Sequence, residues 1–313
     1  MHAIGVDIGG TKIAAGVVDA EGRILAQVRR ETDPTSGAAV DATVLAVCQE
    51  LMVSHEVGAI GLAAPGFASA DQRTVLFTPN LPWRDHALAD VVSAKIPGVK
   101  VVVENDANAA GWAEFRFGVA REATDMLLLT IGTGLGGALV VGERLVRGKW
   151  GVGAEVGHLR VVPDGELCGC GLRGCWEQYA SGSALVRQAR SAATARTAEA
   201  GALLELADGD PARITGPHVT YAAKSGDPLA IELLAELGRW IGEGSASVAA
   251  LLDPELVVIG GGVGAAGDLL LEPARAAFRE TLSARGHRPE ARFALAAMGN
   301  DAGIVGAADL ARL

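Results

Sequence analysis

The sequence predicts an α/β protein with mixed sheets, duplicated into two similar lobes that face a central cleft. Half of its 313 residues are hydrophobic, only 4% are aromatic, and 42 are glycine. This composition is typical of closely packed sheets covered by helices. A chain of this length can also bury a large core. The hairpin pattern at Asp7–Thr11 returns at Thr130–Gly134, and this weak internal repeat predicts two related lobes.

The expected elements follow from short apolar runs and longer helical runs separated by turn residues. Strands are predicted over residues 3–8, 13–18, 23–30, 57–63, 99–103, 126–131, 137–142, 256–259 and 292–298. Helices are predicted over residues 38–54, 85–95, 183–206, 228–252, 268–284 and 301–312. We expect a small lobe from residues 1–107 with 299–313, and a large lobe from residues 108–298. The last helix would return to the small lobe.

Charge and hydropathy narrow the class of protein. The net charge is −10 and no basic tract is present, which argues against nucleic-acid binding. No apolar run reaches the length of a membrane span. The N-terminus passes directly into a predicted strand, so we expect no signal peptide. These observations predict a cytoplasmic protein without a nucleic-acid or membrane partner.

A cluster of soft ligands is the most specific feature of the chain. One histidine precedes a glycine-rich C-x-C-x4-C stretch, giving the set His158, Cys168, Cys170 and Cys175. Glycine lets the chain bend tightly enough to aim these side chains at one point. An imidazole and three thiolates form a closed tetrahedral zinc site without an open position, so the zinc would be structural. The alternative, a disulfide with a spare thiol, is disfavoured because the chain has four cysteines and no secretory leader.

Three glycine-rich turns, each after an apolar strand, favour a nucleotide ligand, because such turns expose backbone N–H groups to phosphate. They are Gly9–Lys12, Gly132–Gly134 and Gly260–Gly264. The second and third turns also begin matches to the dinucleotide pattern G-x-G-x-x-G. The second, however, leads into a strand, and the strand after the third lacks a terminal acid. A nicotinamide-dependent oxidoreductase therefore remains only an alternative.

Several polar residues at strand ends and in loops have two readings each. Asp106 could take the proton from an attacking hydroxyl or cap a helix N-terminus. Asp7 could hold hydrated Mg²⁺ or stabilise a turn. Lys12 could neutralise phosphate or be solvated. The remaining candidates could bind sugar hydroxyls or lie on the surface: Asn80, Glu155 and Glu177.

With these residues in view, the chain resembles the ROK family of sugar kinases, and most closely its bacterial members that phosphorylate glucose with ATP. The resemblance covers essentially the whole chain. The glycine turns are similar to the family's phosphate and adenosine motifs, which are loose patterns when taken alone. Two motifs are far more specific: Glu155-Val-Gly-His158 matches E-x-G-H, and Cys168–Glu177 matches C-x-C-G-x-x-G-C-x-E.

The resemblance implies a fold, an activity and residue roles. The fold would be the two-lobed actin-like ATPase and hexokinase fold, which is ribonuclease H-like. The activity would be transfer of the γ-phosphoryl of ATP to the 6-hydroxyl of glucose, the first step of glycolysis. Asp106 would be the catalytic base. Sugar contacts would come from Gly66, Asn80, Asn105, Asp106, Glu155, His158 and Glu177. ATP and Mg²⁺ would lie near Asp7, Gly9, Gly10, Thr11, Lys12, Thr133, Gly134, Gly261, Gly262 and Val263. Structural Zn²⁺ would be bound by His158, Cys168, Cys170 and Cys175.

Some alternatives stay open at this point. The named side chains would bind a generic pyranose, so a kinase for N-acetylglucosamine, N-acetylmannosamine, fructose or another hexose is the nearest rival. A non-catalytic sugar sensor of the same family would need a DNA-binding segment before the first phosphate turn, which here begins near Asp7. Polyphosphate as phosphoryl donor is not excluded. A homodimer or homotetramer is expected.

Overall fold

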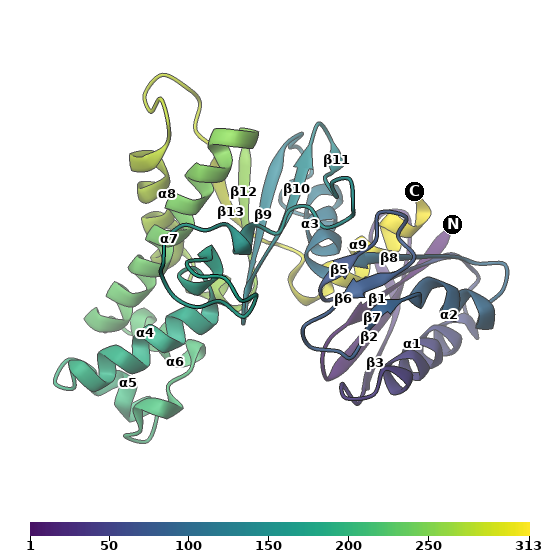
Figure 1. Cartoon of the computed structure of the whole chain (residues 1–313), viewed down its shortest axis with the longest axis horizontal. Coiled ribbons are helices and arrows are strands. Elements are labelled where there is room, and N and C mark those ends of the chain that lie inside the picture. The colour runs from purple at the N-terminus through teal and green to yellow at the C-terminus, as the bar shows by residue number, and fades with distance from the viewer. The chain divides into compact units, whose positions relative to one another are not determined.

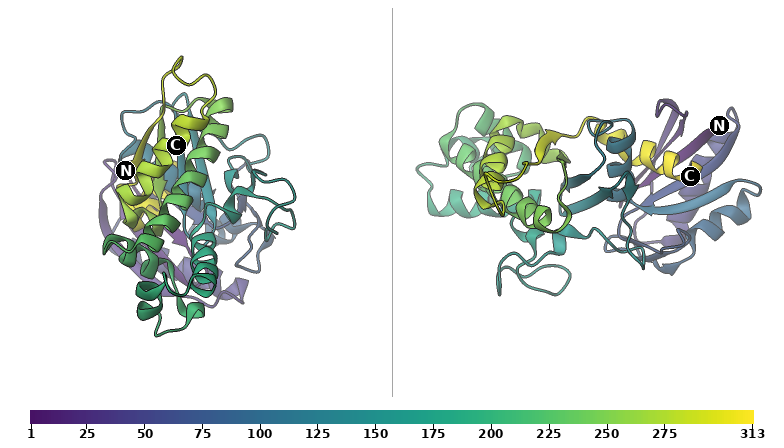
Figure 2. Two further views of the ribbon diagram at one scale, coloured as in Figure 1. Left: turned by 90° about the vertical axis from the view of Figure 1, so that its left-hand side faces the viewer. Right: turned by 90° about the horizontal axis from the view of Figure 1, so that it is seen from above.

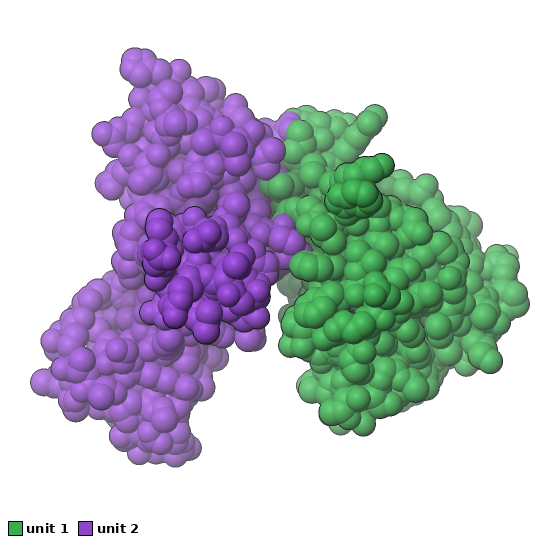
Figure 3. Space-filling model, in the orientation of Figure 1, with its two compact units in different colours: residues 1–124, 138–154, 297–313 green, residues 125–137, 155–296 purple.

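The computed structural model describes all 313 residues and divides them into two compact units (Figure 3). The first unit contains residues 1–124, 138–154 and 297–313, and the second contains residues 125–137 and 155–296. Three separate stretches of the chain thus build the first unit. No helix is long and apolar enough to cross a membrane.

The first unit is built on a five-stranded sheet with the order β3-β2-β1-β4-β8 (Figure 1). Its strands are β1 (His2–Ile8), β2 (Lys12–Val18), β3 (Ile24–Glu31), β4 (Val57–Ala64) and β8 (Lys100–Asn105). The first three strands form an antiparallel meander, and β4 and β8 continue parallel to β1. Parallel strands end at the same edge of a sheet, so the ends of β1, β4 and β8 lie together.

Helices cover both faces of this sheet. Alternating β1 residues such as Ile4 and Val6 pack with α1 (Gly37–Met52) and α2 (Leu88–Lys95). Ala3 on the other face packs with α3 (Asp106–Arg116) and α9 (Ala302–Arg312). Side chains alternate between faces along a strand, which explains this division. Glycine brings α9 close to the sheet, because a Cβ on Gly5 would lie 1.8 Å from the Ile304 carbonyl oxygen.

A second five-stranded sheet repeats this plan, with the order β11-β10-β9-β12-β13. Its strands are β9 (Met126–Ile131), β10 (Leu135–Val141), β11 (Arg144–Leu145), β12 (Leu256–Gly260) and β13 (Arg292–Leu295). β12 is parallel to β9 and β13, whereas β11 is antiparallel to β10. β10 begins in the second unit and ends in the first. The predicted duplication is therefore confirmed at the level of strand order.

The helices of the second unit gather beside its strands (Figures 1 and 2). They are α4 (Gly182–Ala195), α5 (Gly201–Leu206), α6 (Gly216–Lys224), α7 (Pro228–Leu252) and α8 (Asp268–Thr281). Two glycines of α7 let α8 approach closely. A Cβ on Gly242 would lie 2.2 Å from the Ala274 carbonyl oxygen, and one on Gly238 would lie 2.7 Å from that of Leu270.

Several element predictions were wrong in detail. The helix expected over 85–95 begins only at Leu88, because Arg84–His86 form β7 in a small sheet with β5 (Phe67–Ala68) and β6 (Val75–Phe77). The helix expected over 183–206 is two helices, interrupted by a turn at residues 196–200. The predictions omitted α3 and α6, which are short helices with polar residues among their apolar ones.

Candidate active site

Asn105 and Asp106 occupy the junction between β8 and α3. The Asn105 side-chain oxygen accepts a hydrogen bond from the Asn108 backbone N–H at 2.9 Å, so Asn105 is the helix N-cap. Asp106 is the first helical residue, and its Oδ1 accepts from the Ala107 N–H at 2.9 Å. The interpretation of Asp106 as the cap is therefore wrong. Its carboxyl group lies at the N-terminus of α3 instead.

Asn105 also joins Gly66 to this junction. Its side-chain nitrogen donates to the Gly66 carbonyl oxygen at 2.9 Å and to Asp106 Oδ1 at 3.1 Å. Gly66 has a φ of +103°, and a Cβ there would lie 2.3 Å from the Phe77 carbonyl oxygen. Only glycine fits such a backbone position without strain. The structure thus brings Gly66, Asn105 and Asp106 together.

Asp7, at the end of β1, is electrostatically coupled to Asp106. Burial and, to a smaller extent, the Asp106 charge raise the pKa of Asp7 to about 6, although the Arg29 charge opposes both effects. Burial also raises the pKa of Asp106, against the hydrogen bonds from the Ala107 N–H and the Asn105 side chain. Two carboxyl groups that share one site resist double ionisation. Such a site favours binding a cation or accepting a proton.

The first glycine turn begins two residues after Asp7. The Gly9 N–H donates to the Lys12 carbonyl oxygen at 2.9 Å, and a Cβ on Gly9 would lie 2.8 Å from that oxygen. Asn80 is the nearest neighbour of Gly10, with its Cβ 4.0 Å from a Cβ built at Gly10. Thr11 and Lys12 are exposed. A Cβ on Gly10 would therefore meet no atom closer than the Asn80 Cβ, so the backbone of Gly10 is open on that side.

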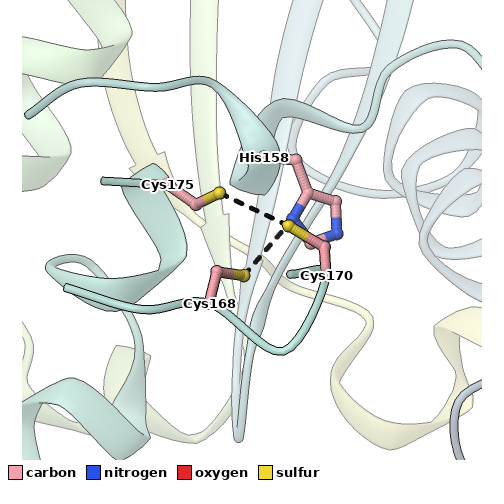
Figure 4. Close-up of side chains that lie close together, drawn as sticks. All are labelled: His158, Cys168, Cys170 and Cys175. Atoms are coloured by element: carbon pink, nitrogen blue, oxygen red, sulfur yellow. Dashed lines mark hydrogen bonds between the residues drawn. The ribbon is translucent and has the colours of Figure 1, made fainter. Parts of the chain in front are cut away.

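In the second unit, the four predicted metal ligands converge (Figure 4). One ligand atom from each of them lies within 4.8 Å of all the others. Cys168 Sγ is 3.7 Å from His158 Nδ1, and Cys170 Sγ is 3.6 Å from Cys175 Sγ. Ligands around a tetrahedral zinc are about 3.5–3.8 Å apart, because Zn–S bonds are about 2.3 Å and Zn–N bonds about 2.0 Å. The donor set and spacing fit zinc, with Nδ1 as the histidine ligand atom.

Glu155 and Glu177 flank this cluster, and Glu177 also contacts the second glycine turn. Glu177 Oε1 accepts from Cys168 Sγ at 3.4 Å, and its Oε2 accepts from the Leu135 N–H at 3.2 Å. A Cβ on Gly134 would lie 2.3 Å from Glu177 Oε2. Glu155 precedes a 3₁₀ turn at Val156–His158, in which the His158 N–H donates to the Glu155 carbonyl oxygen at 3.1 Å. The metal cluster and the Gly132–Gly134 turn are thus directly linked through Glu177, a link that the sequence did not predict.

The second glycine turn opens onto a pocket of about 760 Å³. Thr133 lines it together with Gly262 and Val263 from the third glycine turn. Gly261 packs behind it with a φ of +85°, where a Cβ would lie 2.3 Å from the Ile131 carbonyl oxygen. The sequence predictions missed the other wall, which comes from α4 and α6: Gly182, Ser183, Leu185, Val186, Arg187, Arg190, Gly216, Pro217, Thr220, Tyr221 and Lys224.

The pocket suits a flat apolar group attached to an anionic chain. Apolar side chains form much of its wall, and Arg187, Arg190 and Lys224 add positive charge. Concave sites of this size with a few polar groups are typical of small-molecule and cofactor binding. No local signal in α4 or α6 marks these residues, because only the packing of the two helices brings them to the turns.

Comparison with known proteins identifies the relatives of this fold and these motifs. The ROK family model matches residues 3–313. The glucokinase of Streptomyces coelicolor is 50% identical over 309 residues, which cover 99% of this chain and 97% of that protein. An N-acetylmannosamine kinase of Escherichia fergusonii is 31% identical over 100% of this chain and 99% of its own length.

A solved structure agrees with these sequence relatives. It is a ROK family glucokinase from Streptomyces griseus in complex with glucose and AMPPNP, and it is 50% identical to this chain. The match has a TM-score of 0.89 and covers 100% of this chain and 99% of the other. The predicted two-lobed hexokinase-type fold is confirmed, and the chain belongs to the ROK family.

Proposed function

We propose that this chain is a glucokinase, which transfers the γ-phosphoryl group of ATP to the 6-hydroxyl of glucose. One observation carries the proposal. The chain is 50% identical, almost from end to end, to a Streptomyces coelicolor glucokinase and to a Streptomyces griseus glucokinase that binds glucose and AMPPNP. The carboxyl groups and glycine turns described above give the chemistry a physical basis.

Asp106 acts as the general base of this reaction. Its pKa is raised by burial, which makes the carboxylate a better proton acceptor than an exposed aspartate. Asn105 fixes its orientation through the 3.1 Å hydrogen bond to Oδ1. The residues proposed to bind sugar hydroxyls are Gly66, Asn80, Asn105, Glu155, His158 and Glu177.

Positioning and charge neutralisation supply the rest of the catalysis, as phosphoryl transfer requires. The backbone N–H groups of the first two glycine turns, with Thr11, Lys12 and Thr133, bind the phosphates. Mg²⁺, when bound near Asp7, neutralises phosphate charge. The nucleoside occupies the pocket of about 760 Å³ that contains Gly262 and Val263.

Zinc, held by His158 and the three cysteines, has a structural role. His158 uses Nδ1 toward the cluster, which leaves Nε2 for a sugar hydroxyl. The zinc would order the 158–175 loop and thereby fix Glu155 before it and Glu177 after it. We also expect a cytoplasmic homodimer or homotetramer that needs neither nucleic acid nor a membrane.

The proposal is tested by a coupled assay of ADP formation across glucose, mannose, fructose, allose, N-acetylglucosamine and N-acetylmannosamine, with Mg²⁺ or with EDTA. We expect Mg²⁺-dependent turnover that is highest with glucose. Polyphosphate replaces ATP in a parallel series, in which glucose 6-phosphate formation is measured directly. Turnover with N-acetylmannosamine but not glucose would replace the proposed substrate with that of the relative from Escherichia fergusonii. Glucose binding without any turnover would instead indicate a sugar sensor.

A further inference from the structure

Glu104, one residue before the Asn105–Asp106 junction, has no role in the reaction described so far. Its side chain is 2% exposed. Oε1 accepts hydrogen bonds from the Asn105 N–H and the Asn108 side chain, both at 3.0 Å. Oε2 accepts from the Gln72 side chain at 3.2 Å and from Arg147 Nε at 2.6 Å. A buried carboxylate is tolerated when donors and a countercharge satisfy it in this way.

Two of these four bonds act on the junction that contains the base. The bond to the Asn105 N–H fixes the backbone at the last residue of β8. The bond to the Asn108 side chain fixes the first turn of α3. The Asn108 N–H also donates to the Asn105 side chain, which links the two asparagines. Asn105 in turn orients Asp106 Oδ1. Glu104 therefore forms hydrogen bonds on both sides of Asp106, at Asn105 and at Asn108.

Arg147 supplies the countercharge from a different part of the first unit. Its own carbonyl oxygen accepts from the Gly153 N–H at 2.9 Å, which closes a loop over residues 147–153. This loop packs on β5, because a Cβ on Gly151 would lie 2.3 Å from the Ala68 carbonyl oxygen. Directly after it come Ala154, which has a φ of +67°, and then Glu155. The ion pair thus connects the Asp106 junction to the loop that leads into Glu155.

We propose that Glu104 and Arg147 are a positioning pair, which fixes the Asn105–Asp106 junction and the 147–153 loop in one arrangement. Neither side chain touches the reacting atoms. This inference rests on the proposed glucose phosphorylation and on Asp106 as its base. Its consequence is that loss of Arg147 damages catalysis and glucose use together, while ATP binding in the second unit is spared.

The electrostatic consequence of removing Arg147 has a definite sign. Arg147→Met keeps the apolar stem but leaves the Glu104 carboxylate buried without its cation. The other charged groups around this junction are Asp7, which is coupled to Asp106, and Arg29, which acts on Asp7. While Glu104 remains ionised, its uncompensated negative charge favours the protonated form of Asp106. The acidic limb of the kcat profile should therefore move to higher pH.

The test compares wild type with Arg147→Met, Arg147→Lys and the control Arg144→Met, which removes an exposed arginine from the neighbouring strand β11. We expect Arg147→Met to lower kcat/KM for glucose about 10- to 100-fold, since small errors in positioning have effects of this size. KM for ATP should stay within about twofold, and the acidic limb of kcat should rise by about 0.5 pH unit or more. Arg147→Lys should recover part of the loss, because it keeps the charge without the Nε geometry.

Glu104→Gln provides a second route if Arg147→Met does not fold, because it keeps an acceptor oxygen for the Asn105 N–H. It should lower kcat/KM for glucose in the same direction. A folded Arg147→Met enzyme with wild-type kcat/KM and an unmoved acidic limb would overturn the inference. So would a loss of kcat with unchanged KM and pH profile, which indicates merely less folded enzyme. Asp106→Asn is measured in parallel. Normal turnover of Asp106→Asn would refute the proposed base, and an inactive wild type would refute the proposed function. Neither result would bear on the positioning role of Glu104 and Arg147.

Discussion

The two five-stranded sheets share one strand order but differ in what their edges carry. In the sheet of β1, β4 and β8, carboxyl groups lie at the ends of two strands: Asp7 near the end of β1, Glu104 near the end of β8, and Asp106 directly after β8. In the second sheet, the ends of β9 and β12 carry glycine and threonine beside a pocket of about 760 Å³. In the proposed function, one copy of this scaffold would serve proton and cation chemistry, and the other would bind the nucleotide.

This difference shows how a duplicated fold can diverge without changing its topology. The hairpin and parallel strands fix where backbone N–H groups and strand ends meet. The side chains at those ends then decide whether the edge is charged or open to a flat ligand. The following predictions test this division of roles, beginning with the largest expected effect.

Asp106→Asn should remove the proton acceptor and keep the shape of the junction. We expect kcat to fall by about 10³-fold, within the range for loss of a general base, while the glucose dissociation constant changes by no more than about threefold. Stopped-flow or coupled assays give kcat, and calorimetry gives the binding constant. Asp33→Asn, at an exposed aspartate of the same unit, is the matched control. Near-normal turnover of Asp106→Asn would refute the base assignment.

The two glycine turns should differ in their tolerance of a methyl group. A Cβ on Gly9 meets the backbone oxygen of Lys12 at 2.8 Å, whereas one on Gly134 meets the movable end of Glu177 at 2.3 Å. Backbone cannot move aside as a carboxylate can. We therefore expect Gly9→Ala to lower kcat/KM about 100-fold and Gly134→Ala about 10-fold, as expected for errors in positioning.

The control for these glycine variants is Gly201→Ala, because a Cβ there meets nothing within 4 Å. Steady-state kinetics with ATP and glucose as the varied substrates gives the measurement. Equal losses for Gly9→Ala and Gly134→Ala would contradict the idea that a methyl group on Gly134 clashes only with the movable Glu177 side chain.

Cys170→Ala should release the metal and affect the second unit selectively. With three ligands left, we expect metal content near zero after dialysis and a glucose dissociation constant raised about 10-fold, the size of effect seen on disturbing a metal's surroundings. Elemental analysis and calorimetry give the two values. Cys48→Ala is the control, because Cys48 is fully buried in α1 of the first unit. Unchanged metal content in Cys170→Ala would exclude Cys170 as a ligand.

Asp7→Asn should stabilise the protein at neutral pH, in contrast to its expected loss of activity. The folded pKa of Asp7 is about 6, above its usual value of 3.8, so the folded state binds this proton more tightly than the unfolded state. That contribution to stability is complete below about pH 3.8 and is lost as the pH rises through 6.

At pH 7.5 the charged Asp7 therefore costs up to about 3 kcal/mol, at 1.36 kcal/mol for each pKa unit. Thermal unfolding in EDTA should show a higher Tm for Asp7→Asn at pH 7.5 and a much smaller difference near pH 4. A variant that is less stable than wild type at pH 7.5 would mean that the Asp7 charge is favourable in the fold.

The strands of both sheets, except the two-residue β11, were predictable because their apolar runs alternate with glycine turns. The repeat at Thr130 predicted the second copy. Boundaries failed where tertiary packing decided them. Arg84–His86 form a strand only because β6 pairs with them, since the chain there is polar and would suit a helix equally well. The helix α3 was missed because its buried residues include two polar ones, Asn108 and Glu114. Glu114 accepts a hydrogen bond from the Met298 N–H, which is distant in the sequence.

The sequence by itself determined the metal cluster, the glycine turns and the junction at Asp106, because each depends on residue types at short spacing. Only the tertiary structure decided that Asn105 rather than Asp106 caps α3, that Glu177 contacts the second glycine turn, and that α4 and α6 complete the pocket. It also revealed the pair of Glu104 and Arg147. The spacing of residues in a short segment determines which of its side chains and backbone groups can reach one point. The partners of a buried charge or a pocket wall come from segments far apart in the chain, and only the packing of the whole fold brings them together.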